Sequence, residues 1–379
     1  MRTIVIWLVA TVASVNLLWT QQETPLPKSG FSPETSWIRN LDIDKLDPAN
    51  IDDYSKILLL LRCEDIPQAK RIQYAYRYIR GEYAFAKEGA LSHKEEMHGL
   101  VITDAVQTLA HSNHVESISL LEEKLQQWES MRQRPPEQRT SPVPWLNYVR
   151  AALARLKAVR DIPEIKTASD LRRRLERMLQ YINFNGSIAQ WLEALTREIE
   201  ARQSIDHGGP GLYELLLWEY GHQLMQSGWR GVDIEAAAKE IRDYLKRSGC
   251  QVPLFEVYLE LGKIPREKLA QWIVDDAMNW QGIGTFAESK SQMLVDLGVS
   301  VVPLVWEKLV WAARHRDQIK GTGMGLVALL EVLVTLGGEQ ALPLIEPFTR
   351  DENEWVRYYA CRAKEYIQQG KVFRFAPYF

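Results

Sequence analysis

The stretch Leu294-Val295-Asp296-Leu297-Gly298 returns further along the chain as Leu333-Val334-Thr335-Leu336-Gly337. A second stretch, Val302-Pro303-Leu304, returns at nearly the same offset as Leu342-Pro343-Leu344. A period of about 40 residues with a glycine at the turn is typical of stacked pairs of helices, in which each pair buries its apolar face against the next. The repeat therefore predicts an all-α fold whose C-terminal part is an α-solenoid of stacked helical hairpins.

The second copy of the repeat continues into an acidic turn at residues 349–354, which leads to Val356-Arg357 and then to Ala360. This pattern resembles the short bacterial HEAT repeat, an armadillo-like helical repeat. We expect Asp351 or Asn353 to cap the helix after the turn. Val356 and Ala360 lie four residues apart, so we expect them to share one buried face of that helix.

The resemblance covers about 80 residues, from Ser291 to Gln369. It implies a fold that holds other molecules, without catalytic residues and without a cofactor. We therefore expect a non-catalytic protein-binding scaffold or adaptor. The residues that carry the repeat signature are Leu297, Gly298, Pro303, Leu336, Gly337, Pro343, Asp351, Val356, Arg357 and Ala360.

The composition is that of a folded protein with a sizeable core, because 46% of the residues are hydrophobic and 25% are charged. The net charge of −3 argues against a nucleic-acid-binding protein, which usually carries a strong positive excess. The 13 tryptophans suit seams between helices and interfaces. Cys63, Cys250 and Cys361 are too far apart and too few for a disulfide framework, so we expect them to act as small hydrophobic residues.

One break in the helical pattern lies at residues 132–144, and another at residues 205–211, where three glycines and a proline cannot continue a helix. We place the main boundary at residues 205–211 and expect helices on both sides. Cap patterns predict helix starts at Ser92 with Glu95, Asn113 with Glu116, and Thr167 with Asp170. The predicted parts are a signal peptide or membrane anchor at 1–20, a linker at 21–33, an N-terminal helical region at 34–204, a HEAT-like repeat region at 211–370 and an aromatic tail at 371–379.

The N-terminal residues 4–19 are almost all apolar and follow Arg2, as in a secretory signal. About 16 apolar residues are slightly short for a membrane span. We expect the protein to be exported, to the periplasm or the extracellular space, or to be anchored to a membrane by this segment. A buried N-terminal core helix is the alternative interpretation.

Two further segments are candidates for contact with a partner. The aromatic tail is expected to cap the last repeat, and a free motif read by a partner is the alternative. The stretch 150–177 carries nine Lys or Arg against four Asp or Glu. Its arginines either form a solvated helix face or contact an acidic partner or lipid head groups. The candidate partner-binding residues are Arg172, Arg173, Arg174 and Arg177.

An exported helical enzyme is the alternative function, with two candidate chemistries. Glu95-x-x-His98 and Glu219-x-x-His222 each place a carboxylate and an imidazole on one helical face, and two such motifs occur in di-iron bundles. Exposed polar helix faces explain the same spacing without a metal. Asp275-Asp276, between Trp272 and Trp280, would suit a carbohydrate-active enzyme, or a solvated helix face. No catalytic residue is assigned from the sequence.

Overall fold

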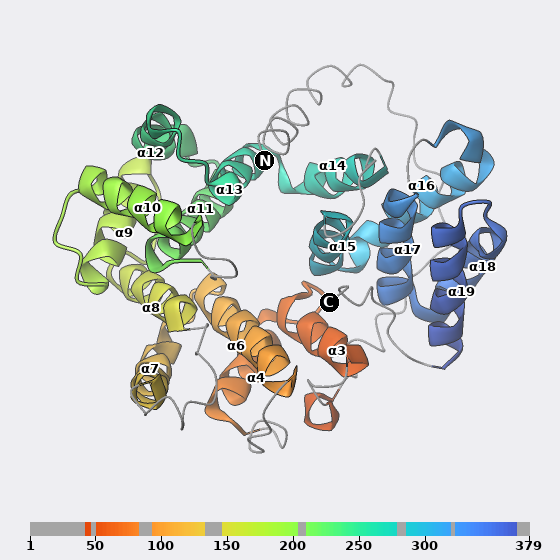
Figure 1. Ribbon diagram of the computed structural model, residues 1–379, viewed down its shortest axis with the longest axis horizontal. Helices are drawn as coiled ribbons and strands as arrows, with labels where there is room; N and C mark the ends of the chain where they lie inside the picture. The colour runs from red at the N-terminus through yellow and green to blue at the C-terminus, as the bar shows by residue number, and fades with distance from the viewer. Residues whose placement is uncertain are drawn as a thin grey trace.

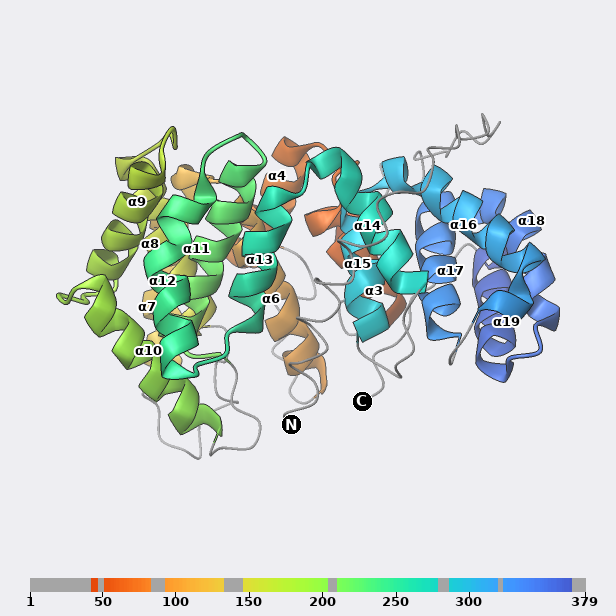
Figure 2. The same ribbon diagram turned by 90° about the horizontal axis from the view of Figure 1, so that it is seen from above.

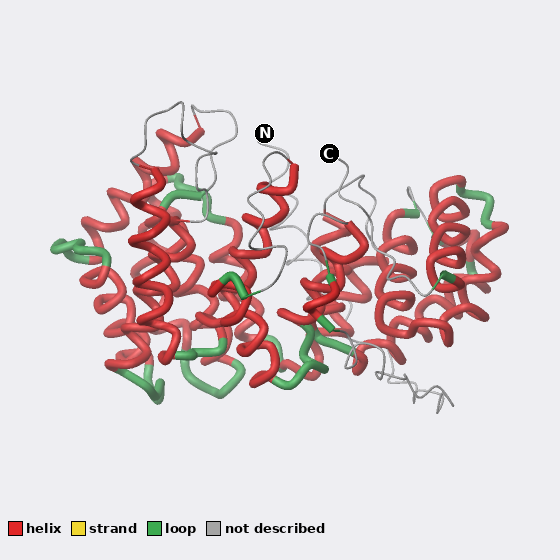
Figure 3. Tube along the Cα trace, turned by 90° about the horizontal axis from the view of Figure 1, so that it is seen from below, coloured by secondary structure: helices red, strands yellow, loops and turns green. Residues whose placement is uncertain are grey.

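The computed structural model describes residues 42–46, 51–82, 93–132, 146–203, 210–278, 286–319 and 323–369. In these ranges the chain forms helices and no strand (Figure 3). The predicted all-α class is therefore confirmed. The predicted signal or anchor, the linker and the aromatic tail lie outside the described residues.

The first helices pack around α6, which contacts α3, α4 and α8. Helix α4 ends at a glycine in the left-handed conformation, Gly81 with φ of 72°, which a residue with a side chain rarely adopts. The bounds are α3 (Ile51–Arg62), α4 (Gln68–Arg80), α6 (His93–His111), η2 (Val115–Ser117), α7 (Ile118–Arg132) and α8 (Leu146–Asp161).

In the middle of the chain, α11 is central and packs against α8, α10, α12 and α13. The predicted cap at Thr167 is confirmed: its hydroxyl accepts from the Asp170 amide, and its own amide donates to the Asp170 carboxylate. The bounds are α9 (Ala168–Tyr181), α10 (Ile188–Gln203), α11 (Leu212–Gly228), α12 (Ile234–Ser248) and α13 (Pro253–Lys263).

Helices α11 and α13 approach each other through glycines. A Cβ atom on Gly228 would overlap the carbonyl oxygen of Gly262, and one on Gly221 would lie 3.0 Å from the ring of Tyr258. A side chain at either position would push the two backbones apart. The glycines therefore place Tyr258 of α13 directly against α11.

The C-terminal helices pack as consecutive pairs, α14 with α15, α16 with α17, and α18 with α19. Helix α15 also packs on α17, and α17 on α19, so each pair contacts the next (Figure 1). The bounds are α14 (Arg266–Met278), α15 (Phe286–Asp296), η4 (Val299–Val301), α16 (Val302–Arg314), η5 (Arg316–Gln318), α17 (Met324–Gly337), η6 (Gly338–Ala341), α18 (Leu342–Ile345), η7 (Glu346–Arg350) and α19 (Glu354–Gln368).

The two copies of the repeat adopt similar but not identical turns. Pro303 and Pro343 each lie in the first turn of a helix, where the missing amide hydrogen costs no intrahelical bond. Gly298 has a φ of 78°. In the second copy the glycine with a positive φ is Gly338, at 54°, whereas Gly337 is helical with φ of −96°. The glycine that makes the turn has therefore moved by one position between the copies.

The turn before α19 resolves the two capping candidates. The Asn353 side chain accepts from the amides of Trp355 and Val356, so Asn353 is the cap. Asp351 instead accepts two hydrogen bonds from the Arg316 guanidinium, at 2.7 and 3.0 Å. Val356 and Ala360 are fully buried, which confirms that they share one buried face.

The predicted cap at Asn113 is wrong. Helix α6 ends at His111, and Asn113 takes a φ of 54° without capping the following turn. Its side-chain oxygen accepts from Arg155 at 3.4 Å instead. Asparagine tolerates the left-handed region, and a buried guanidinium needs acceptors more than a short surface turn needs a cap.

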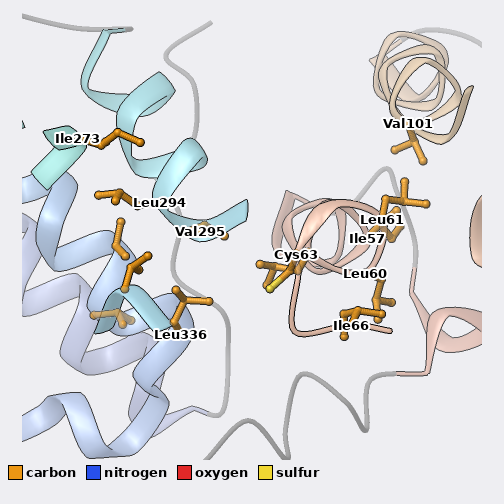
Figure 4. Packing of buried hydrophobic residues seen from close by; sticks show 14 of the residues in the cluster. Ile57, Leu60, Leu61, Cys63, Ile66, Val101, Ile273, Leu294, Val295 and Leu336 are labelled. Carbon is orange, nitrogen blue, oxygen red and sulfur yellow. The ribbon is translucent and has the colours of Figure 1, made fainter. Parts of the chain in front are cut away.

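The buried apolar side chains form two clusters. One joins α3, α4 and α6 with α14 to α19, and Figure 4 shows its side chains around Cys63 and Val295. The other is formed by α8 to α13. The boundary predicted at residues 205–211 stays a prediction, and the buried side chains of α10 and α11 on its two sides belong to the same cluster.

The helices follow one another around an open ring in Figure 1, and in Figure 2 they form a curved row from α9 and α10 to α18 and α19. The residues that follow α3 contact the end of α15 and the start of η4. The Glu64 amide donates to the Asp296 carbonyl at 2.9 Å, and the Val299 amide donates to the Asp65 carboxylate at 2.6 Å. A Cβ atom on Gly298 would lie 2.7 Å from the Asp65 carboxylate, so a side chain there would shift the acceptor of this hydrogen bond. Polar contacts therefore join two segments that lie 234 residues apart in the sequence.

One stretch, Met324–Arg350, is long and apolar enough to cross a membrane by length and composition. However, 78% of its apolar window is buried inside the structure. Helix α17 therefore has the burial of a core helix. Export and membrane anchoring through residues 4–19 stay predictions, because that segment lies outside the described residues.

Candidate functional site

A cluster of charged and polar side chains lies between α6, α8, α11 and α13. At its centre Arg155 of α8 is fully buried. Its Nη1 lies 2.9 Å from Glu219 Oε2 and 3.0 Å from His222 Nδ1, both on α11. Removing a guanidinium from water costs several kcal/mol unless a carboxylate and further acceptors compensate. Glu219 supplies that carboxylate in this cluster.

The second amino group of Arg155 binds two side-chain amides. Nη2 donates to Asn113 Oδ1 at 3.4 Å and to Gln226 Oε1 at 3.2 Å. Among the described residues, Arg155 Nε is buried without a hydrogen-bond partner. One guanidinium thus joins α8 to α11 and to the turn that follows α6.

Two imidazoles lie against this ion pair. The rings of His111 and His222 stack with centroids 3.7 Å apart and 12° between their planes. His111 Nε2 is 3.4 Å from Glu219 Oε2. The ring of Tyr258 meets His222 edge-on, with centroids 5.8 Å apart. Two stacked imidazoles beside a guanidinium are compatible with each other only when they are neutral.

The pKa directions agree with that charge assignment. Burial lowers the pKa of His111 and that of His222. The contact with Glu219 opposes this shift at His111, whereas the Arg155 charge adds to it, and at His222 the charges of His111 and Arg155 add to the effect of burial. Burial alone would raise the pKa of Glu219, but its contacts with His111 and Arg155 outweigh burial and lower that pKa to about 2. With both imidazoles neutral near pH 7, Arg155 provides the charge that keeps Glu219 ionised.

The cluster continues toward solvent through a second set of charges. Arg62, at the end of α3, lies 2.7 Å from Asp296 of α15 and 3.6 Å from Asp104 of α6. The Arg62 side chain is 37% exposed, against 8% for Glu219. Tyr258 is influenced by both sets of charges, and burial raises its pKa to about 12. The second set of charges therefore lies at a more exposed place than the first, where α3 meets α15.

This arrangement holds helices together rather than presenting free chemical groups. Arg62, Arg155 and Glu219 each have an oppositely charged partner within the chain. Among the side chains that the structure describes, no three His, Cys, Asp or Glu residues form a group that could hold a metal ion. The cluster has the properties of a structural clamp.

The structure describes the side chains of two of the four candidate metal-binding residues. Glu219 and His222 lie together in the cluster, and both contact Arg155. Glu219 is buried, so it does not lie on the exposed polar helix face of the alternative interpretation. The side chains of Glu95 and His98, on α6, lie outside the described residues. The four-residue metal site stays a prediction.

The candidate partner-binding arginines occupy different environments. Arg174 is buried and donates to the carbonyls of Ile162 and Pro163 and to Gln223 Oε1. Burial lowers its pKa to about 10. Its charge is thus used inside the chain, whereas the other three arginines are exposed. Their ion pairs are Arg172–Glu240, Arg173–Asp170 and Arg177–Asp161.

The candidate carbohydrate site is occupied by an internal contact. Asp275 lies 2.6 Å from Lys308 of α16 and accepts from Gln271 at 2.9 Å. Trp280 lies outside the described residues. Asp275 therefore links α14 to α16, and the catalytic role stays a prediction.

A second candidate site lies on α19. Trp355 is 48% exposed and Tyr358 is 47% exposed. Arg362 donates to the hydroxyls of Tyr358 and Tyr366, and its guanidinium lies 5.8 and 5.5 Å from their ring centroids. We call Trp355, Tyr358, Arg362 and Tyr366 the α19 stripe. Sequence reasoning missed it, although the spacing of three, then four, then four positions places these side chains on one helical face.

The third exposed large hydrophobic side chain of the described residues is Trp311 of α16, at 40%. It stacks on His315 with centroids 5.0 Å apart, and Lys308 lies 5.7 Å from its ring centroid. The ion pair between Arg316 and Asp351 ties the segment after α16 to the segment before α19. The exposed aromatic residues thus belong to α16 and α19, at one end of the molecule (Figure 2).

Comparisons with protein-family models, with curated proteins and with solved structures give no match to this chain.

Proposed function

We propose that the protein is a non-catalytic scaffold that binds another protein, built on HEAT-like helical hairpins stacked as an α-solenoid. The consecutive packing of α14–α15, α16–α17 and α18–α19 supports this arrangement. The observation that carries the binding function is the α19 stripe, because Trp355 and Tyr358 are two of the three exposed large hydrophobic side chains among the described residues.

The chemistry of the stripe favours a protein partner. Trp, Tyr and Arg are the residues that most often dominate binding energy at protein interfaces. Arg362 is already held between Tyr358 and Tyr366, so little side-chain entropy is left to lose on binding. Isolated exposed aromatic residues are common, but a continuous group on one helix points to an interaction surface.

The proposal includes export. If residues 4–19 direct the chain across a membrane or hold it there, the partner is a periplasmic, extracellular or membrane-surface protein. The stripe carries no run of positive charges, so a protein surface with apolar and hydroxyl groups suits it better than lipid head groups.

A capture experiment tests the function. The full-length chain, expressed with its N-terminal segment in its own host, is cross-linked and purified, and co-purifying proteins are quantified. Trp355→Ala with Tyr358→Ala should reduce capture of the specific partner by about 30-fold, the effect of losing at least about 2 kcal/mol at a hot spot. The matched control is Gln368→Ala, an exposed residue of α19 outside the stripe, which should capture as wild type does. Equal capture by the stripe variant would refute the proposal.

Metal analysis tests the alternative enzyme. Stoichiometric iron or zinc in the purified protein, lost in His222→Ala with the helical content unchanged, would favour a metal-dependent enzyme over a scaffold.

A further inference from the structure

Helix α19 lies at one end of the curved row of helices and carries exposed aromatic side chains (Figure 2). Helix α15 packs on α17, and α17 packs on α19, which is the last described helix. The terminal repeat of a soluble solenoid usually presents a polar outer face. On α19, however, Trp355 is 48% exposed and Tyr358 is 47% exposed. A further helix laid on the α19 stripe would continue the row and cover both rings.

One row of side chains on α19 is complementary to its own reverse. Glu354, Tyr358 and Arg362 are exposed and follow one another at intervals of four residues, so they form one ridge along the helix. Along the helix axis, the carboxylate and the guanidinium each lie about 6 Å from the tyrosine, on opposite sides of it. If the row is turned end to end about Tyr358, the carboxylate meets a guanidinium and the tyrosine meets a tyrosine.

We propose that the α19 stripe binds the same stripe of a second copy of this chain, with the two helices antiparallel and a two-fold axis beside Tyr358. The inference rests on the proposed function, because it names the protein that the stripe binds. Any other protein would need an arginine, an aromatic residue and a carboxylate in the reverse order and at the same spacing. A second copy supplies that order by symmetry.

Each Arg362 has donors available for the second copy. A guanidinium has five N–H groups, and within its own chain Arg362 donates to the hydroxyls of Tyr358 and Tyr366. Further N–H groups can therefore bind the Glu354 carboxylate of the second copy. Trp355 of one copy comes within about 1.5 Å of the level of Arg362 of the other, so its ring can contact that guanidinium.

The two other cations of α19 are held within their own chain. Arg357 donates to the carbonyls of Asp351 and Glu352, at 2.5 and 3.3 Å. Lys364 pairs with Glu346 at 2.6 Å. Both cations also lie more than a quarter of a turn around the helix from the middle of the row. Neither cation therefore opposes the antiparallel register.

The remaining carboxylate of α19 neither favours nor opposes this register. Glu365 comes level with the turn before α19 of the second copy, at residues 349–353. In that turn Arg350 and Glu352 are exposed and carry opposite charges. Asp351 of the same turn is already paired with Arg316. The attraction and the repulsion that Glu365 meets there largely cancel.

The charges also select the direction of the pairing. Two parallel copies would place Arg362 beside Arg362 and Glu354 beside Glu354, so like charges would face each other. Antiparallel pairing about a two-fold axis uses the same surface of both chains, so the assembly closes at two copies. The 15 residues of α19 span about 22 Å, which makes a small interface. We therefore expect a reversible dimer with a Kd on the order of 10 µM.

Charge reversal tests the pairing. The full-length chain is analysed by sedimentation velocity at concentrations below and above the expected Kd, in a non-ionic detergent that keeps the apolar residues 4–19 from associating. Glu354→Arg and Arg362→Glu, each alone, bring like charges together across the axis and should raise the Kd of the dimer at least about tenfold. An equimolar mixture of the two variants restores both opposite pairs, so a mixed dimer should form with nearly the wild-type Kd.

The matched control is Gln368→Arg, which adds a positive charge at an exposed position of α19 outside the row and should dimerise as wild type does. Circular dichroism of each variant checks that the helices are intact. Three outcomes would overturn the inference. The first is a wild-type chain that stays monomeric well above the expected Kd. The second is a single variant that dimerises as wild type does. The third is a mixture of the two variants that forms no dimer.

Failure of this inference and failure of the proposed function give different results. A monomeric wild type whose variant Trp355→Ala with Tyr358→Ala loses capture of a different protein would overturn the second copy and leave the scaffold proposal standing. A monomeric wild type whose variant captures as wild type does would refute both.

Discussion

Replacing Glu219 by Gln should destabilise the protein strongly, because it leaves the guanidinium of Arg155 buried without a carboxylate. The Arg155 side chain is fully buried, and the Glu219 side chain is 8% exposed. Breaking a buried ion pair on one side costs about 3–5 kcal/mol, since the remaining charge has lost its partner but not its burial. That loss is a large part of the roughly 5–15 kcal/mol by which a domain is typically stable.

The assay is urea unfolding at pH 7.5, followed by tryptophan fluorescence and by far-ultraviolet circular dichroism. The matched control is Glu240→Gln, which removes a carboxylate from an exposed pair with Arg172. Exposed pairs contribute about 1 kcal/mol or less, so this variant should resemble wild type. The double variant Arg155→Met with Glu219→Gln should recover most of the lost stability, because neither member of the pair then leaves an unpaired buried charge.

Two results would refute the reasoning. A loss below about 1 kcal/mol in Glu219→Gln would show that the pair does not clamp α8 to α11. A double variant less stable than Glu219→Gln alone would show that Arg155 contributes through its other hydrogen bonds rather than through the ion pair.

Three further predictions concern other parts of the molecule. The free energy of unfolding should fall as the pH drops below about 6.5, the pKa of histidine in the unfolded chain. His111 and His222 have lowered pKa values in the folded protein, so below that pH the unfolded chain binds protons that the folded protein does not. Urea midpoints that stay constant between pH 7.5 and 5.5 would contradict this. Asp65→Ala removes the acceptor between the end of α3 and η4, so it should cost about 1–3 kcal/mol and accelerate amide exchange in η4; unchanged exchange there would show that the contact is dispensable. Cys361 is exposed, so a thiol reagent should modify it in the native protein. Cys63 is buried with a pKa raised to about 12, so it should react only after unfolding. Mass spectrometry of the modified peptides checks both, and early labelling of Cys63 would contradict the packing at the end of α3.

Local patterns in the sequence predicted local structure well. The capping pair at Thr167 and Asp170 and the buried pair Val356 and Ala360 each depend on residues within one turn or one helix. Such interactions need no distant partner, so spacing along the chain is enough to predict them. The all-α class follows from the same short-range spacing.

The charged cluster could not be predicted in the same way. The Glu219-x-x-His222 spacing was visible, but it fits a metal site, an exposed face or a buried clamp equally well. The contacts of Arg155, which is distant in the sequence, with Glu219 and with Asn113 of the turn after α6 make it a buried clamp. Asn113 illustrates the reason: its local pattern predicts a cap, yet the need of a distant buried guanidinium for acceptors changes its role.

The sequence alone determined the all-α class, the cap at Thr167 and the turns that carry glycine or proline, because these depend on backbone preferences and on side chains three or four positions apart. Only the tertiary structure decided which distant helices meet and which of the remaining side chains stay exposed. Helix α19 packs against α17 and buries Val356 and Ala360, and that arrangement leaves Trp355 and Tyr358 facing solvent. Burial depends on which helices meet in space, and that is a property of the whole chain.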